Sequence, residues 1–357
     1  MALYWLAEPL LYVCYAILAG WLILIRTAPG FQVPSKIVAG AAIGIGLFGI
    51  FPILRIVMFF AEDLGLGLTV QNVLFRFDEG KAFLWTVLIV LCLCFIIRIA
   101  KPESNRKAWI LCLLLLVAMM GAQGWSSHAT SFYGTLGFVP QTLHLYAVSL
   151  WSGTLLLAGQ YLPIERWKSF LTWFHPTAML AMTVIVGSGF MLTVLAAPEY
   201  VNSWVLPYGQ ALLLKHLLWI PLIVFAVFNG WWVKRKLSRQ ASFNPKPWAQ
   251  AEGIFILLIY IVTGFMNQQA APHDVSETLK ESPASLLYIW LHGELTERTE
   301  SFHFGFEPIS IVCGGVALLN LIYLMIRTPK ELRPLSAITA GLLFVTFAFV
   351  SAITAIT

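Results

Sequence analysis

The sequence predicts an all-α fold, a polytopic bundle of about ten transmembrane helices with both termini extracytoplasmic. Of its 357 residues, 59% are hydrophobic and only 11% are charged, whereas charged residues make up about a quarter of a soluble domain. The apolar residues fall in runs of about 18–25, long enough for helices to cross a hydrocarbon core of roughly 30 Å. Strands of a membrane barrel are much shorter, so the runs indicate helices.

The predicted spans follow one another along the chain. The N-terminal sequence MALYWLAEPLL lacks a basic region and a small-residue cleavage site, so we expect the first apolar run to be retained as a span. The second run carries four glycines followed by Pro52, a pattern typical of close helix packing and a kink. The expected spans are 8–26, 36–60, 82–100, 107–124, 138–161, 169–196, 211–234, 248–269, 308–327 and 334–355.

Lys and Arg gather in alternate connections between these spans. Sixteen of the 22 lie within 26–36, 98–107, 166–168, 234–246 and 327–333, the connections that follow the odd-numbered spans. Because basic connections face the cytoplasm in membrane proteins, both termini are predicted to be outside. The lipid bilayer is the surrounding medium, and no basic patch suggests nucleic-acid binding.

The spans and connections group into four regions. We expect an N-terminal four-span region (1–124), a four-helix core (125–269), an acidic extracytoplasmic segment (270–307) and two C-terminal spans (308–357). Neither a phosphate-binding loop nor a local Ser/His/Asp signature is visible, so the chain is predicted to be a transporter rather than an enzyme.

The acidic segment 270–307 is too short to have a core of its own. Its stretch SETLKESPASLLYIWLHGEL can form a short amphipathic helix that lies on the membrane or covers the bundle. We expect its histidines to recruit metal ions from outside; they are His273, His292 and His303.

The start of the four-helix core carries two histidines, His128 and His144, that flank an uncharged loop. His144 lies about two turns inside its span from the outer end, and His216 lies about equally deep in the span 211–234. Imidazole and thioether groups together suit copper, whereas a carboxylate-rich set would suit Mg, Ca or Mn. The candidate ligands near this depth are His128, His144, His216, Met119, Met120, Met191 and Met266.

Each of these residues also has a structural interpretation. A Met in a span is commonly core filler, and a His near a helix end commonly makes only an interfacial hydrogen bond. Lys215, in the outer third of its span, either marks a polar cavity or extends to the lipid headgroups. His175, Met179 and Met182 share one helix face, which is either an inward path for the ion or an apolar packing stripe.

Several of these motifs in combination resemble the copper-resistance protein D (CopD/PcoD) family. The family pattern pairs a histidine near the outer end of one span with one in the next, followed by a Trp–Gly element. The residues of this chain that resemble the pattern are His128 and, after it, the stretch TLHLYAVSLWSG, which contains His144, Trp151 and Gly153. The matching pieces that follow are GQALLLKHLLWIPLIVFAVFNGWW, with Lys215 and Asn229, and AEGIFILLIYIVTGFMNQQAAPHD, with Glu252 opening the helix.

The resemblance covers about 125–275 and implies a multi-pass protein of the bacterial cytoplasmic membrane, associated with copper uptake or resistance. It also implies polar support of the metal site by Lys215, Trp151 and Glu252, and a partner of the extracytoplasmic CopC type. The chain departs from the family in three respects. It shows no CopC-like β-domain, it reads WSG where WxGG is common, and it carries two further spans after the acidic segment.

Three functions remain open from the sequence. The first is a copper transporter that binds the ion at the outer His/Met site and passes it through the bundle. The second is a haem b electron carrier or oxidoreductase with His144 and His216 as axial ligands, since two histidines on different helices at one depth suit haem. The third is an assembly factor for a copper oxidase, which binds copper without transporting it.

Overall fold

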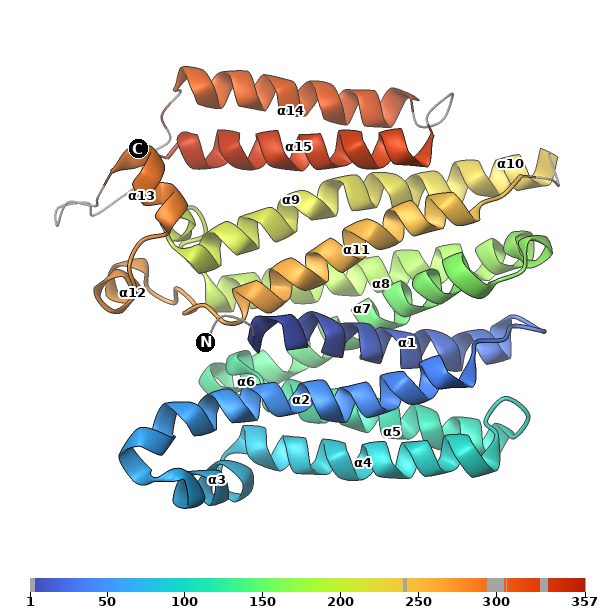
Figure 1. Ribbon diagram of the computed structural model, residues 1–357. Helices are drawn as coiled ribbons and strands as arrows, with labels where there is room; N and C mark the ends of the chain where they lie inside the picture. Colours follow the sequence, from blue (N-terminus) through green and yellow to red (C-terminus); the bar gives the residue numbers. More distant parts are fainter. Residues whose placement is uncertain (1–3, 240–242, 294–304, 306, 328–332, 357) are drawn as a thin grey trace. The chain divides into compact units, whose positions relative to one another are not determined.

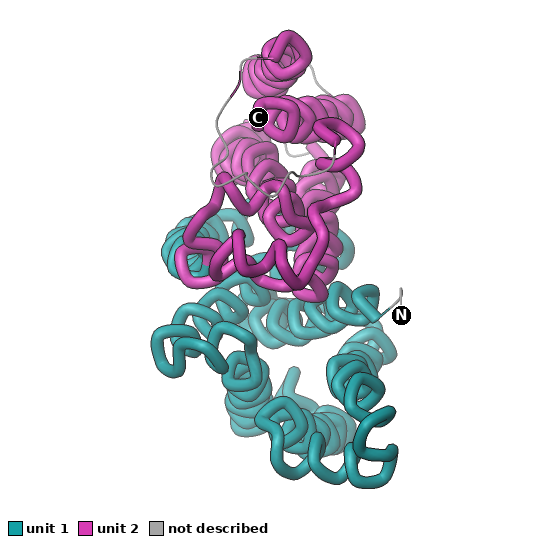
Figure 2. The backbone as a smooth tube through the Cα atoms, turned by 90° about the vertical axis from the view of Figure 1, so that its left-hand side faces the viewer, with its two compact units in different colours: residues 1–192 teal, residues 193–357 magenta. Residues whose placement is uncertain are grey.

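The computed structural model describes residues 4–239, 243–293, 305, 307–327 and 333–356. Within these residues the secondary structure is helical, with no β-strand, which confirms the predicted all-α class (Figure 1). Nine of the described helical segments are long and apolar enough to cross a membrane. The chain divides into two compact units, unit 1 (Met1–Leu192) and unit 2 (Thr193–Thr357), coloured separately in Figure 2.

The helices of unit 1 follow the expected spans closely. Two short helices, α3 and α6, lie in connections between the long ones. The bounds are α1 (Ala7–Thr27), α2 (Ser35–Leu64), α3 (Leu66–Phe75), α4 (Asp78–Ala100), α5 (Arg106–Trp125), α6 (His128–Tyr133), α7 (Thr135–Tyr161) and α8 (Trp167–Ala196), the last few residues of which belong to unit 2.

The helix α7 corresponds to the expected span 138–161 but is not among the nine apolar segments. Its 27 residues are long enough to cross a bilayer at 1.5 Å per residue. Polar residues interrupt its apolar pattern, and four of them are buried in unit 1, namely Thr142, Ser149, Ser152 and Thr154. These side chains face protein within unit 1, and α7 as the tenth span stays a prediction.

A contact between glycines brings α1 and α7 together. A Cβ atom at Gly153 would overlap the backbone carbonyl of Ala16, and one at Gly20 would overlap the backbone of Gly153. Small residues let helix backbones approach closely, which is how helices associate in a membrane. Gly153, the glycine of the WSG element, therefore has a packing role in unit 1.

One end of unit 1 carries two of the basic connections. Arg26, at the end of α1, donates to the carbonyl oxygen of Pro102 at 3.1 Å, and its guanidinium lies 5.3 Å from the ring centre of Trp109. The indole of Trp109 donates to the carbonyl of Leu22 at 2.7 Å. The α1–α2 and α4–α5 connections are therefore neighbours, as alternating basic loops require.

Unit 2 contains three helices in mutual contact, α9, α11 and α15, with α14 packed on α15. Its bounds are α9 (Pro207–Val227), a π-helical segment (Phe228–Val233), α10 (Lys234–Arg239), α11 (Lys246–Met266), α12 (Val275–Glu281), α13 (Leu286–His292), α14 (Pro308–Arg327) and α15 (Pro334–Thr354). The expected span 211–234 thus continues through a π-helical turn to Arg239.

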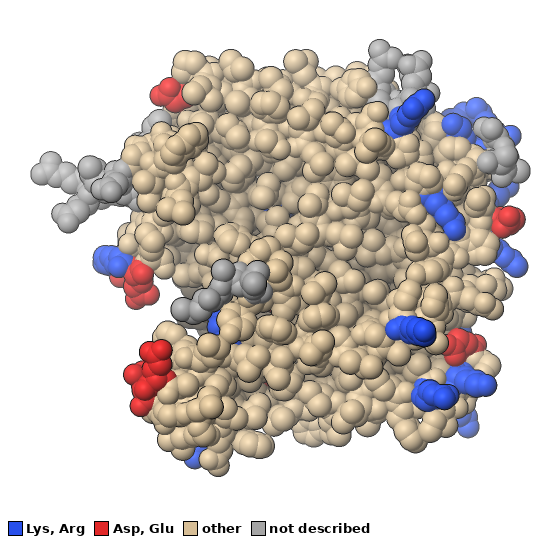
Figure 3. Space-filling model, in the orientation of Figure 1, with Lys and Arg blue, Asp and Glu red and all other residues tan. Residues whose placement is uncertain are grey.

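The helix α13 contacts one end of this three-helix group. Gln210, near the start of α9, donates to Ser285, which caps α13, and His292 lies 3.0 Å from the carbonyl oxygen of Ile353 near the end of α15. The start of α9 and the end of α15 therefore share one end of unit 2, and the basic α10 lies at the other. Figure 3 shows Lys and Arg gathered by the α4–α5 connection of unit 1 and over α10 of unit 2.

Two details of the sequence-based expectations are wrong. The single amphipathic helix expected after His273 is two helices, α12 and α13, because Pro283 cannot continue a helix and Ser282 before it is extended (φ −130°, ψ 130°). Glu252 does not open its helix: α11 begins at Lys246, and Glu252 lies in the second turn.

Candidate functional site

His144, on α7, is held by a residue of α8. Its Nδ1 lies 3.0 Å from Oγ of Ser188. The single hydroxyl proton of Ser188 is directed at the carbonyl oxygen of Val184 one turn earlier, so Oγ accepts from Nδ1–H of His144. This tautomer puts the imidazole lone pair on Nε2, the nitrogen that would bind a metal ion.

The neighbouring glycine makes room for the imidazole. A Cβ atom at Gly189 would lie 3.3 Å from Cε1 of His144, closer than ordinary side-chain contacts. The sequence Gly187-Ser188-Gly189 thus combines a hydrogen-bond acceptor with a residue small enough to admit the ring. The glycine–serine–glycine pattern inside an apolar span marks a polar position in the sequence, but it does not identify His144 as the partner.

His216, on α9 of unit 2, has an analogous partner. Its Nδ1 lies 2.8 Å from the phenol oxygen of Tyr200, and the ring centres are 5.5 Å apart. Burial raises the pKa of Tyr200 to about 12, so the phenol keeps its proton at neutral pH. The phenol either donates to Nδ1 or accepts from Nδ1–H, and the second arrangement leaves the lone pair on Nε2. Sequence analysis missed Tyr200, which precedes α9 in a connection without a recognisable motif.

The predicted supporting residues are buried to different degrees. Lys215 is partly buried beside His216, and it forms no ion pair within the described part of the chain. Trp151 is buried, and its Nε1 has no hydrogen-bond partner among the described residues. Glu252 is buried and accepts a hydrogen bond from Nδ2 of Asn229 at 2.6 Å. Sequence reasoning named Asn229 only through the family resemblance.

The candidate methionines fall into two classes. Met119 and Met120, on α5, are buried in unit 1, and Met266, on α11, is buried in unit 2 against Tyr208 and Ala211. Met191, on α8, is 47% exposed. Burial suits core packing as well as metal binding, so the positions alone do not assign a ligand role.

Other predicted positions lie at the surface of their unit. His128 begins α6, is exposed, and has its ring centre 4.6 Å from that of Phe132. Along α8, Met179 is 60% exposed, whereas His175 and Met182 are partly buried. The three residues share a helix face, and their role as an inward path stays a prediction.

The outer histidines are in contact with backbone. Nδ1 of His273 lies 3.0 Å from the carbonyl oxygen of Leu195, and Nε2 of His292 is bonded to Ile353 while its ring stacks on Tyr288 at 4.7 Å. His303 lies outside the described residues.

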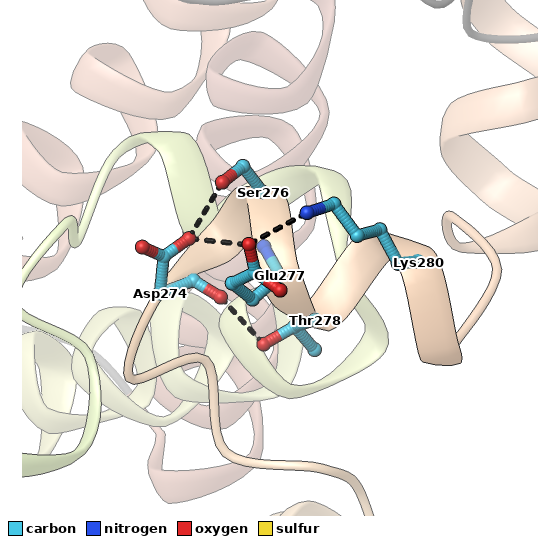
Figure 4. A network of polar contacts seen from close by, with 5 residues as sticks. All are labelled: Asp274, Ser276, Glu277, Thr278 and Lys280. Carbon is cyan, nitrogen blue, oxygen red and sulfur yellow. Dashed lines mark hydrogen bonds and ion pairs between the residues drawn. The ribbon is translucent and has the colours of Figure 1, made fainter.

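The carboxylates nearest to these histidines stabilise the helix α12 (Figure 4). Asp274 accepts from the backbone N–H of Glu277 at 3.0 Å and from the hydroxyl of Ser276 at 2.8 Å, and Lys280 pairs with Glu277 at 2.6 Å. The backbone hydrogen bond from Glu277 holds the pKa of Asp274 below its usual range. Asp274 therefore acts as a helix cap, which leaves it poorly suited to recruit metal ions.

No group of three or more His, Cys, Asp or Glu side chains is arranged to hold a metal ion within the described residues. His144 belongs to unit 1 and His216 to unit 2. The predicted ligand set is therefore not assembled inside either unit from these residue types, and a shared site for the two histidines stays a prediction.

Comparisons with known proteins identify the family. A family model described as copper resistance protein D matches residues 168–266, and one described as copper resistance protein D-like, N-terminal domain matches residues 10–138. The second match extends the resemblance to the first four spans, where the sequence motifs were generic. His144, Trp151 and Gly153 lie between the two matched regions.

One curated relative is the copper transport protein CutJ of Bacillus subtilis (strain 168), 24% identical over 222 residues. The match covers 58% of this chain and 40% of the relative, so the chain spans less than half of that protein. No solved structure matches the chain. The two family matches together cover more than half of the chain, nine described helical segments can cross a membrane, and the chain is a multi-pass membrane protein of the copper resistance protein D family.

Proposed function

We propose that the chain is a copper transporter that takes the ion at its extracytoplasmic face and passes it into the membrane bundle. The observation that carries this proposal is the hydrogen bond from His144 to Ser188, which orients an imidazole with its Nε2 lone pair inside a membrane span. Membership of a copper resistance family supplies the identity of the ion. The basic connections that share an end in unit 1 support the predicted orientation, with both termini outside.

The candidate thioether ligands of unit 1 lie on α8 and α5. Met191 lies three residues after Ser188 on α8, hence on the same helix face one turn further along. Met119 and Met120 lie on α5, which packs against α7. Imidazole and thioether bind copper and release it more readily than thiolate does, which suits stepwise transfer. In the proposal His128 and His144 form the outer gate, and the methionines relay the ion inward.

Unit 2 carries candidate ligands of its own. In the proposal His216, which is hydrogen-bonded to Tyr200 and follows Lys215 in the chain, binds the ion in that unit, and Met266 lies on the neighbouring helix α11. His175, Met179 and Met182 are the candidate exit path along α8. An inside-negative membrane potential favours inward movement of each positive charge by about 2.3 kcal/mol per 100 mV, so uptake needs no nucleotide. His273, His292 and His303 would receive copper from an extracytoplasmic CopC-type partner.

Copper uptake into proteoliposomes tests the proposal. Wild-type protein is compared with His144→Ala at equal protein level, with an inside-negative potential imposed. We expect uptake by the wild type and a loss of most of it in the variant. Tyr146→Phe is the matched control, because it alters the same helix and removes only a hydroxyl bonded to the carbonyl of Val117.

Three results would contradict the proposal. Equal uptake by His144→Ala and the wild type would remove His144 from the pathway. A haem absorption band in the purified protein that disappears in His144→Ala would instead favour the electron-carrier function. Copper binding without uptake by the wild type would favour the assembly-factor function.

A further inference from the structure

Unit 2 buries a carboxyl group that the proposed copper pathway does not use. The side chain of Glu252 on α11 is only 2% exposed. Its Oε2 accepts a hydrogen bond from Nδ2 of Asn229 at 2.6 Å, and the same amide lies 3.3 Å from the carbonyl oxygen of Trp248. A neutral amide is the only side chain that bonds this carboxyl group among the described residues.

The helix that supplies Asn229 departs from α-helical geometry at that residue. Asn229 is the second residue of the π-helical segment Phe228–Val233, which joins α9 to α10. Such π-helical turns are rare and occur frequently at functional sites. The π-helical turn therefore lies beside the buried carboxyl group, because Asn229 and Glu252 are hydrogen-bonded although 23 residues separate them in the sequence.

Aromatic rings line the surroundings of the pair. The ring centres of Phe228 and Trp248 lie 4.4 Å apart, and those of Phe225 and Phe255 lie 5.4 Å apart. These side chains come from the same two helical segments as Asn229 and Glu252. Glu252 itself is buried, and burial disfavours the ionised form of a carboxyl group unless a counter-charge is near.

No ion pair is formed by Glu252 within the described residues. The cations of the α10 end contact rings instead, with Lys236 over Trp232 and Arg235 over Trp231. The other charged or titratable groups on the elements around Glu252 are Lys234 and Arg239 on α10, Lys246 and Tyr260 on α11, and Tyr208, Lys215 and His216 on α9. Lys215 and His216 lie roughly 20 Å along the helix from Asn229, and α15 carries no titratable side chain.

We propose that Glu252 is a proton-binding site. Its carboxyl group is neutral while it is shielded from water, and it exchanges its proton with water at the α10 end of unit 2. In the exchange the carboxyl O–H bond breaks and the proton passes to water, while the carboxylate keeps the hydrogen bond from Asn229. A proton from water restores the acid. The coupling to copper rests on the proposed function. Because the protonation of Glu252 follows the pH at the α10 end of unit 2, copper movement depends on that pH.

A hydrophobic carbodiimide, dicyclohexylcarbodiimide, tests the proton site independently of transport. It reacts with protonated carboxyl groups in apolar surroundings and leaves a mass label. With the full-length protein in liposomes, mass spectrometry is expected to find the label on Glu252 at neutral pH and its loss as the pH is raised to about 10. The exposed Asp274 and Glu277 are internal controls that stay unlabelled at neutral pH. An unlabelled Glu252, or labelling that does not change with pH, would overturn the proton site.

Copper uptake tests the coupling. Glu252→Gln keeps the size and the neutral form of the side chain but cannot release a proton, so uptake by this variant is expected to lose the pH dependence of the wild type. Glu252→Asp is expected to retain a pH dependence. An unchanged pH dependence in Glu252→Gln would overturn the coupling. If the wild type moves no copper at all, the proposed function fails, and the label on Glu252 still decides the proton site.

Discussion

The backbone of Gly153 in α7 lies directly against the backbone carbonyl of Ala16 in α1, closer than any side chain would allow. The first prediction follows from this contact. Gly153→Leu is expected to lower the stability of unit 1 by at least about 1–3 kcal/mol, the usual effect of overpacking, because a backbone cannot move aside as a side chain can. Thermal unfolding of the purified protein, followed by its aggregation or tryptophan fluorescence, measures the effect.

Gly187 on α8 provides the control for this substitution. A Cβ atom there would meet nothing within 4 Å, so Gly187→Leu is expected to leave the melting temperature nearly unchanged. A melting temperature of Gly153→Leu equal to that of the wild type would contradict the close approach of α1 and α7.

The second prediction concerns Ser188. Ser188→Ala is expected to weaken copper binding by roughly tenfold or more while leaving the fold intact, because a residue that orients a metal-binding histidine typically contributes 10–100-fold to affinity. Copper titration of the purified protein gives the affinity. The ¹⁵N chemical shifts of His144 report whether Nδ1 still carries the proton.

Thr183→Ala, on the same helix, is the matched control. It also removes a hydroxyl bonded to a backbone carbonyl, but Thr183 is exposed and forms no hydrogen bond with His144 in the described part of the chain. Unchanged histidine shifts in Ser188→Ala would show that Ser188 does not select the tautomer.

The third prediction is a pH dependence. Because burial raises the pKa of Tyr200 to about 12, the folded protein keeps this proton at a pH where the unfolded chain has lost it. The unfolded state then binds fewer protons, so the free energy of unfolding falls as the pH rises from about 10 towards 12. The free energy of unfolding of Tyr200→Phe is expected to lack the part of this decrease that comes from Tyr200.

Absorbance of phenolate near 295 nm checks the assignment of Tyr200. The difference between the wild type and Tyr200→Phe isolates one tyrosine, whose titration midpoint is expected near 12. A midpoint near 10, the value of an exposed tyrosine, would contradict the burial of Tyr200 and weaken its role beside His216.

The fourth prediction is the orientation. In a variant without its native cysteines, Ser282→Cys, between α12 and α13, is expected to react with a membrane-impermeant thiol reagent from outside the cell. Ser238→Cys, in the basic helix α10, is expected to react only after the membrane is permeabilised. The reverse pattern would contradict the predicted placement of both termini outside.

The long elements of this fold can be predicted from the sequence because each is a run of apolar residues of the length that a bilayer requires. The predicted span 8–26 became Ala7–Thr27, and 334–355 became Pro334–Thr354. The division after α12 could also have been predicted, since Pro283 follows directly on a helical pattern. The π-helical turn at Asn229 has no comparable signal in the sequence.

The candidate site was less predictable than the spans. Helix depth follows from counting residues along a span, so His144 and His216 could be named as candidates, and their role as ligands stays a prediction. The partners of these histidines depend on helix rotation and on which helices are neighbours, and periodicity provides neither. Ser188 and Tyr200 are therefore findings of the structure, 44 and 16 residues away from the histidines that they contact.

The position of α13 has a consequence for the order of assembly during synthesis. The contact between His292 and Ile353 joins residues 61 positions apart, and α14 and α15 lie between them in the chain. The segment that contains α13 leaves the ribosome before these two helices, yet its contact with α15 cannot form until both have been inserted. The contact of α13 with α15 is therefore among the last to form in unit 2, and a nascent chain stalled before α15 would lack it while keeping the hydrogen bond from Gln210 to Ser285.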